Sequence, residues 1–153
     1  MGEKPARSVE QTVRRSLELF HGGFCCSESV LLASTERLGL QSELVPRIAT
    51  GFCGGMAHAG SVCGAVSGAV MALGCVQGRD VGGAPREAIF ASVQQLAATF
   101  RERWGSIDCP VLLGCDLGTE EGQRRFREQD LKTQRCDRFV EEAVRVALER
   151  IDD

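Results

Sequence analysis

Apolar residues recur every three or four positions through most of this chain, which is the spacing of one face of an α-helix. The first such segment begins at a capping box formed by Ser8 and Gln11 and ends at Gly22 and Gly23. The same pattern predicts further helices over residues 26–38, 62–73, 85–104, 119–130 and 136–148, and short helical segments over 42–50 and 110–113. No segment alternates apolar and polar residues like a half-buried strand. The sequence therefore predicts an all-α bundle of six or seven helices.

Length, charge and hydrophobicity limit the number of domains and the kinds of partner that we expect. The chain has 153 residues, of which 43% are hydrophobic, so we expect one domain over residues 1–153 with an ordinary core. Acids and bases are interspersed and the net charge is -3, which excludes nucleic acid and anionic membranes as partners. The most apolar stretch, residues 62–76, is shorter than the roughly 20 residues that span a bilayer. Because the N-terminus also lacks the apolar core of a secretory signal, we expect a cytoplasmic protein without membrane insertion.

Cysteine is unusually frequent in this chain. The eight cysteines are Cys25, Cys26, Cys53, Cys63, Cys75, Cys109, Cys115 and Cys136. In a reducing cytosol we do not expect structural disulfides, so metal binding and redox chemistry become the favoured uses of these cysteines. Some of these residues could equally be plain core, because unpaired cysteine is often buried.

Four of the cysteines fall at predicted helix starts: Cys26, Cys63, Cys109 and Cys136. A helix N-terminus offers free N–H groups and the positive end of the helix dipole, so we expect cysteines there to be shifted toward thiolate. Thiolates are the form that ligates metals and attacks disulfides. Cys75 and Cys115 lie near predicted helix ends instead, and Cys53 lies in a glycine-rich loop.

Four stretches of the chain resemble a known family. They read GFCCSESVLLASTERLGL, RIATGFCGGMAHAGSVCGAVSGAVMALG, FRERWGSIDCPVLLG and RCDRFVEEA. Together they are similar to the C_GCAxxG_C_C family of redox-active proteins, with a central motif Cys63-Gly64-Ala65-Val66-Ser67-Gly68. The resemblance covers roughly residues 9–147. It implies that Cys26, Cys63, Cys109 and Cys136 are the family's four recurrent cysteines, and that the chain is redox-active.

Related domains in cytochrome-containing proteins are associated with an iron–sulfur centre. The resemblance therefore implies such a cofactor here, although the chain has no Cys-x-x-Cys-His and should carry no c-type haem. Cys25 stands where the family has a polar residue, and the vicinal pair Cys25-Cys26 leaves open which sulfur faces inward.

Four thiolates can ligate a [2Fe–2S] or [4Fe–4S] cluster or a zinc ion. Their separations in this sequence fit neither zinc-knuckle nor common ferredoxin spacing. A site assembled from four helix starts forms only in the folded bundle, which favours a cofactor site over a metal site that stabilises the fold. Two of the four cysteines could instead cycle through a disulfide without metal, or zinc could stabilise an interaction module.

The central motif continues a stripe of small residues, namely Gly60, Gly64, Gly68 and Ala72. Such a stripe lets another backbone, or an inorganic cluster beside Cys63, approach closely. We therefore count Gly64 and Gly68 as candidate cofactor-binding residues, with close helix packing as the alternative.

Two histidines and two acids near these cysteines are further candidates for a functional role. His58 is open to three interpretations: a ligand, a proton donor to the site, or an exposed polar residue. His21 is expected to be structural, and Glu28 and Asp137 are expected to be favourable acids in a first helical turn.

The sequence thus predicts a small redox protein with an iron–sulfur cluster on four cysteines, used for electron transfer or redox sensing. An unidentified redox partner protein is implied. A homo-oligomer and any catalytic turnover are left open.

Overall fold

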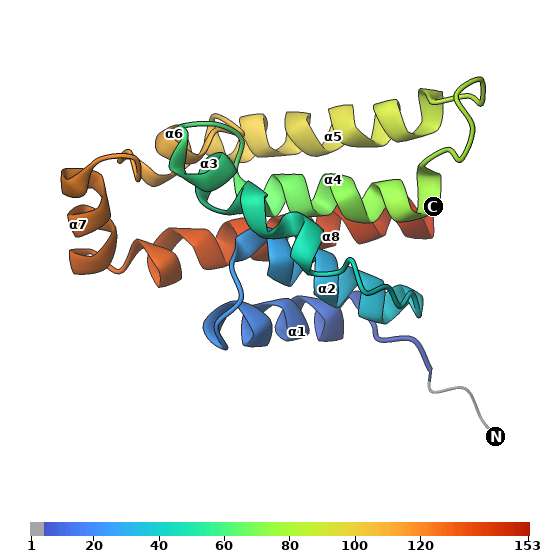
Figure 1. Cartoon of the computed structure of the whole chain (residues 1–153), viewed down its shortest axis with the longest axis horizontal. Coiled ribbons are helices and arrows are strands. Elements are labelled where there is room, and N and C mark those ends of the chain that lie inside the picture. The colour runs from blue at the N-terminus through green and yellow to red at the C-terminus, as the bar shows by residue number, and fades with distance from the viewer. Residues whose placement is uncertain (1–4) are drawn as a thin grey trace.

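Helices account for nearly all regular structure in residues 5–153, the part of the chain that the computed structural model describes (Figure 1). The α-helices are α1 Val9–His21, α2 Cys26–Leu38, α3 Cys53–His58, α4 Gly64–Gln77, α5 Glu87–Trp104, α6 Cys109–Leu113, α7 Glu120–Glu128 and α8 Asp137–Asp152. A 3₁₀-helix, η1, spans Arg47–Phe52, and a π-helical turn, η2, spans Lys132–Cys136. The described residues form no strand, only an isolated bridge between Val62 and Asp108. The predicted all-α class is confirmed for residues 5–153, which form eight α-helices rather than six or seven.

Several helix ends follow directly from local chemistry. The Ser8 hydroxyl accepts a hydrogen bond from the Gln11 N–H at 3.1 Å, and the Gln11 side chain accepts from the Ser8 N–H at 2.9 Å. Gly39, Gly105 and Gly114 end α2, α5 and α6 in the left-handed conformation that a side chain disfavours. These boundaries agree with the sequence prediction because each depends on a few neighbouring residues.

Other boundaries differ from the prediction. α5 begins at Glu87 rather than at Pro85, and α6 begins at Cys109 with Pro110 in second position. The segment predicted as a short helix after Ser42 contains turns and then η1. Proline is tolerated throughout the first helical turn, so it marks a start only to within a residue or two.

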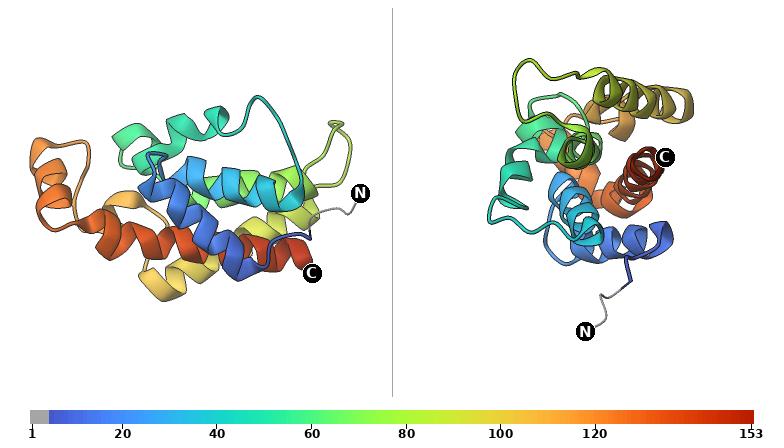
Figure 2. Two further views of the ribbon diagram at one scale, coloured as in Figure 1. Left: turned by 90° about the horizontal axis from the view of Figure 1, so that it is seen from below. Right: turned by 90° about the vertical axis from the view of Figure 1, so that its right-hand side faces the viewer.

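α4 is the central helix of the bundle. It packs against α2, α5 and α8, and α1 packs against α2 and α8 (Figures 1 and 2). α4 approaches α2 closely because its buried face is built from small residues. α3 and α6 lie at the end of the bundle where α4 begins, and α7 lies beyond them (Figure 1). The first residues of α4 are therefore surrounded by several short elements.

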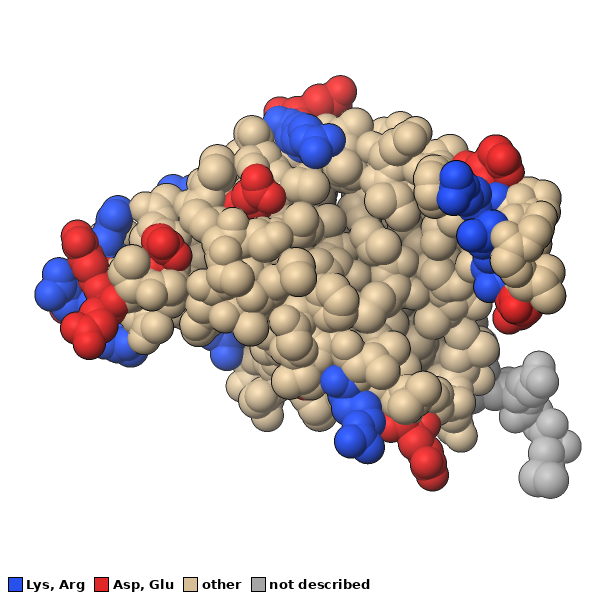
Figure 3. Space-filling model, turned by 45° about the horizontal axis from the view of Figure 1, so that its top comes forward, with Lys and Arg blue, Asp and Glu red and all other residues tan. Residues whose placement is uncertain are grey.

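The surface agrees with the charge pattern of the sequence. On the face shown in Figure 3, acidic and basic side chains are interspersed near the edges, and the middle carries little charge. Within residues 5–153 no helix is both long and apolar enough to cross a membrane.

Candidate functional site

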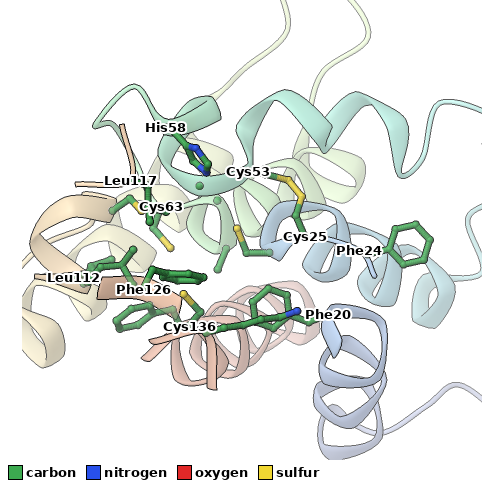
Figure 4. Close-up of a pocket in the computed structure, with 18 of the residues that line it drawn as sticks. Phe20, Phe24, Cys25, Cys53, His58, Cys63, Leu112, Leu117, Phe126 and Cys136 are labelled. Carbon is green, nitrogen blue, oxygen red and sulfur yellow. A yellow bond between two sulfur atoms is a disulfide. The ribbon is translucent and has the colours of Figure 1, made fainter. Parts of the chain in front are cut away.

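A cavity of about 420 Å³ lies where α4 begins (Figure 4). This volume is in the range of small-molecule and cofactor sites, about 300–1,000 Å³. Six of the eight cysteines line it: Cys25, Cys26, Cys53, Cys63, Cys109 and Cys136. The structure therefore brings the four predicted cysteines together around one space, along with two that the prediction left out.

Backbone pairing places Cys63 beside Cys109. The Cys63 N–H donates to the Ile107 carbonyl at 2.8 Å, and the Cys109 N–H donates to the Ser61 carbonyl at 2.9 Å. These two bonds form a short antiparallel bridge between the segments that enter α4 and α6. Both cysteines are buried. Two residues 46 positions apart thus reach the same cavity wall through main-chain geometry.

Cys26 reaches the cavity because Gly64 has no side chain. Cys26 is the first residue of α2, and Gly64 is the first residue of α4. A Cβ atom at Gly64 would overlap the Cys26 sulfur and lie 2.9 Å from the Phe52 carbonyl oxygen. Gly64 is therefore required for the position of the Cys26 thiol.

Gly68 has a different role from Gly64. It does not line the cavity, and a Cβ atom there would lie 2.7 Å from the Ser27 carbonyl oxygen and 3.0 Å from the Val30 Cβ. Gly68 thus allows α4 to pack against α2. The structure supports the helix-packing interpretation for this glycine and gives it no direct contact with the cavity.

Cys136 does not occupy a free helix start. It has helical backbone angles and lies at the end of η2, which continues directly into α8. The predicted start of the last helix at about Cys136 agrees with α8 to within one residue, but because η2 precedes it, the Asp137 N–H is already hydrogen-bonded to the Lys132 carbonyl. A π-helical turn shifts the register of the residues that follow it, and such turns are frequent at functional sites. Here the turn ends at a cavity-lining thiol.

Burial outweighs the helix dipole at the cavity thiols. It is the largest cause that raises the pKa of Cys63 to about 12 and that of Cys109 to about 12. Burial likewise raises the pKa of Cys26 and of Cys136 above the usual range. Negative charges on neighbouring cysteines raise the pKa values of Cys63, Cys109 and Cys136 further. The expected shift toward thiolate is wrong for the thiols by themselves, because burial disfavours the charged form and neighbouring thiolates repel one another.

The distances between the four thiols indicate whether they could bind a single metal ion. Zn–S bonds of about 2.3 Å place the sulfurs of a tetrahedral zinc site about 3.8 Å apart. Among the described residues, only Cys25, Glu28 and Cys53 form a trio of candidate ligands whose atoms lie within 4.8 Å of one another. No three of the four cavity thiols meet that limit. They surround a space wider than a mononuclear site.

A disulfide joins Cys25 to Cys53, with the two Cα atoms 5.9 Å apart (Figure 4). The sequence analysis, which expected no structural disulfides, did not predict this pair. The bond links the start of α2 to the start of α3 along one side of the cavity. Of the vicinal pair, Cys26 keeps a free thiol and Cys25 forms the disulfide. The vicinal pair was the signal in the sequence, but nothing in the spacing identified Cys53 as its partner.

The segment after Cys53 adopts an unusual backbone. Residues 54–58 all have positive φ, including the non-glycine residues Met56, Ala57 and His58. L-residues in this region cost roughly 1–2 kcal/mol each, so surrounding contacts must hold the segment in place. The left-handed turn brings His58 to the cavity wall, where its side chain is exposed (Figure 4). This placement is compatible with a ligand or proton donor.

The remaining wall comes from side chains other than those of the cysteines. Its apolar part includes Phe20, Leu112, Leu113, Leu117, Phe126 and Phe139. Arg127 and Lys132 also line the cavity, and none of the described Asp or Glu residues does so. Sequence reasoning missed these two cations because Arg127 lies in what reads only as a polar helix and Lys132 lies between that helix and the next predicted one.

The other residues singled out in the sequence are structural. The Glu28 carboxylate accepts from the Cys25 N–H at 2.9 Å and from the Thr50 hydroxyl at 2.7 Å. His21 Nε2 lies 2.7 Å from an Asp137 carboxylate oxygen and ties α1 to α8.

Neither of the two remaining cysteines lines the cavity. Cys75 is exposed near the end of α4, and Cys115 is buried outside the cavity wall.

The fold and the cavity define an all-helical, cysteine-rich protein with thiols gathered on one site. Residues 24–150 match the family described as "Putative redox-active protein (C_GCAxxG_C_C)", and the chain belongs to this family. A protein of Archaeoglobus fulgidus described as uncharacterized is 28% identical over 155 residues, which cover 95% of this chain and 96% of that protein. No solved structure matches the chain significantly.

Proposed function

We propose that this redox-family protein binds an iron–sulfur cluster through Cys26, Cys63, Cys109 and Cys136, and uses it for electron transfer or redox sensing. The observation that carries the proposal is that these four thiols, from four different elements, line one cavity of about 420 Å³. When bound, such a cluster would supply one-electron transfer.

The residues present fit a cluster in three respects. Gly64 leaves room for the Cys26 sulfur, so the thiols approach without displacing backbone. The thiols are spread more widely than a single zinc ion needs. A cluster of several iron and sulfide atoms would need a wider arrangement of thiols than one metal ion does, and Cys26, Cys63, Cys109 and Cys136 would hold it. Finally, four buried thiols that resist ionisation by themselves would ionise readily next to a cationic metal.

Two other functions are distinguishable from this one. In a metal-free thiol–disulfide protein, two of the four cysteines would cycle between thiols and a disulfide. In a zinc-stabilised interaction module, the cavity would hold zinc and carry out no redox step. The spacing of the thiols disfavours a single zinc ion, and none of the four forms a disulfide in the structure.

Anaerobic purification followed by visible absorption and assays of iron, zinc and acid-labile sulfide would separate the three. A cluster predicts broad visible absorption with iron and sulfide in comparable amounts. Stoichiometric zinc in a colourless protein would support the interaction module. A metal-free protein in which two of the four thiols oxidise reversibly would support the thiol–disulfide function.

A further inference from the structure

The Cys25–Cys53 disulfide plays no part in the proposed cluster site, yet it lines the same cavity. Both residues are partly exposed, so the bond can be reached by a small molecule that enters the cavity. A purely structural disulfide needs no such access.

A buried hydroxyl touches both sulfur atoms. Ser27 is fully buried, and its Oγ lies 3.0 Å from the Cys53 sulfur and 3.7 Å from the Cys25 sulfur. The same Oγ lies 2.7 Å from the Ala49 carbonyl oxygen and donates its proton there. By rotating, this hydroxyl can donate to a Cys53 thiolate, and in its present orientation it can accept from a Cys53 S–H. It can thus support Cys53 in every state that disulfide cleavage produces.

The two cysteines are also held together without the disulfide. The Thr50 hydroxyl donates to Glu28, the Ser27 hydroxyl donates to Ala49, and the Cys25 N–H donates to Glu28. These bonds connect the start of α2 to η1, which leads directly into Cys53. Because they do not involve sulfur, they remain when the disulfide opens. The reduced thiols stay close, and their effective concentration favours closing the bond again.

We propose that Cys25–Cys53 is a reversible thiol-exchange site for low-molecular-weight thiols, with Ser27 as the residue that supports the departing Cys53 sulfur. A thiolate attacks the Cys25 sulfur, forms a mixed disulfide with it and releases Cys53 as a thiolate. The proton lost by the incoming thiol neutralises Cys53. A second thiol attacks the mixed disulfide, leaves as the small-molecule disulfide and returns a proton to Cys25. Two external thiols are oxidised and one protein disulfide is reduced.

The charge of the cavity indicates the class of thiol. Arg127 and Lys132 line it, none of the described acidic residues does so, and among the described residues neither cation has an ion-pair partner. The Glu28 carboxylate lies within 4.8 Å of both disulfide sulfurs, but it is outside the cavity wall and accepts hydrogen bonds from the Cys25 N–H and the Thr50 hydroxyl. Negatively charged thiols should therefore enter more readily than positively charged ones.

The test uses the full chain in its native state. The protein is treated with 2-mercaptoethanesulfonate or with cysteamine at equal thiolate concentration, and is then returned to the matching disulfide. After quenching with an alkylating reagent, mass spectrometry reports the state of Cys25 and Cys53, and the exposed Cys75 thiol serves as the reference for alkylation. We expect reversible opening with unchanged circular dichroism, and at least about threefold faster reduction by the sulfonate. Reduction that requires unfolding, or a reduced pair that does not close again, would overturn the proposal. Equal rates with the two thiols would overturn the charge preference.

A matched pair of variants tests Ser27. Ser27→Ala should slow reduction about tenfold, because it removes a hydrogen bond to a charged sulfur. Ser34→Ala changes another fully buried serine of α2 that contacts neither sulfur, and should leave the rate unchanged. Ser27→Thr keeps the hydroxyl and should restore much of the rate. If Ser27→Ala reacts as fast as the wild type, the role of Ser27 is refuted.

This readout does not depend on metal content. A protein without iron whose disulfide opens and closes would refute the cluster proposal alone. A protein with iron and sulfide whose disulfide is inert would refute the exchange site alone.

Discussion

Gly64 and Gly68 lie one helical turn apart on α4, and replacing each by alanine should have different consequences. At Gly64 the added methyl group would overlap the Cys26 sulfur, which is the end of a side chain that can rotate, and would lie 2.9 Å from the Phe52 carbonyl oxygen. At Gly68 the methyl group would lie 2.7 Å from the Ser27 carbonyl oxygen, a backbone atom of α2 that cannot move alone. The first change therefore acts on the site and the second acts on helix packing.

The magnitudes follow from two opposing effects. Overpacking a helix contact costs about 1–3 kcal/mol. Replacing a helical glycine by alanine recovers up to about 1 kcal/mol of helix propensity. For Gly68→Ala we expect a net loss of about 1–2 kcal/mol, which corresponds to a fall in Tm of roughly 2–8 °C for a chain of this size. Gly64→Ala should cost a comparable amount, because rotation of the Cys26 side chain relieves the overlap with its sulfur but not the close contact with the Phe52 carbonyl oxygen.

Iron and sulfide content, measured beside thermal unfolding by circular dichroism, checks both variants. Gly64→Ala should lose most of its cofactor while it remains helical, and Gly68→Ala should keep its cofactor in proportion to the folded fraction. A Gly64→Ala protein with full iron content and an unchanged visible spectrum would show that the Cys26 sulfur need not lie where the structure has it. The reasoning about the site would then fail.

Three further changes test other parts of the structure. Cys63→Ser should abolish the visible absorption while helicity persists, because a hydroxyl is a poor ligand for iron. Cys75→Ser should leave the spectrum intact. A Cys63→Ser protein with normal absorption would show that Cys63 is not a ligand. Hydrogen bonds from Arg15 are the largest cause that holds the pKa of Glu36 below its usual value. The stabilisation is therefore present above the unfolded-state pKa of about 4.3 and is lost as the pH falls through the lower folded-state pKa. Glu36→Gln should cost about 0.5–1 kcal/mol in urea unfolding at pH 7 and much less near pH 2, and an equal cost at both pH values would contradict this. Phe100 is fully buried, so Phe100→Ala should lower the free energy of unfolding by about 3–5 kcal/mol in denaturant titrations, whereas a loss below 1 kcal/mol would mean that the core is not packed as described.

Much of the helical architecture could be predicted because it depends on near neighbours in the chain. The capping box of Ser8 and Gln11 and the terminal glycines Gly39 and Gly105 act within one helical turn. Helical periodicity likewise identified the long stripe of α5. The family motif named the four cysteines that the structure then gathers around one cavity.

Only the tertiary structure decided how those residues meet. Cys25 pairs with Cys53 because packing of η1 against α2 brings two distant segments into contact. The residues around each cysteine in the sequence do not indicate that the two lie close together in the fold. The same packing assigns Gly64 to the cysteine site and Gly68 to the helix contact, although the two look alike in the sequence. The positive φ angles of Met56 and Ala57 oppose the local preference of both residues, so they persist only where surrounding contacts impose them. The pKa of Cys63 also depends on tertiary packing, because desolvation is set by the residues that cover the thiol. The sequence correctly placed a helix start next to Cys63, but burial raises the pKa by more than the helix dipole lowers it.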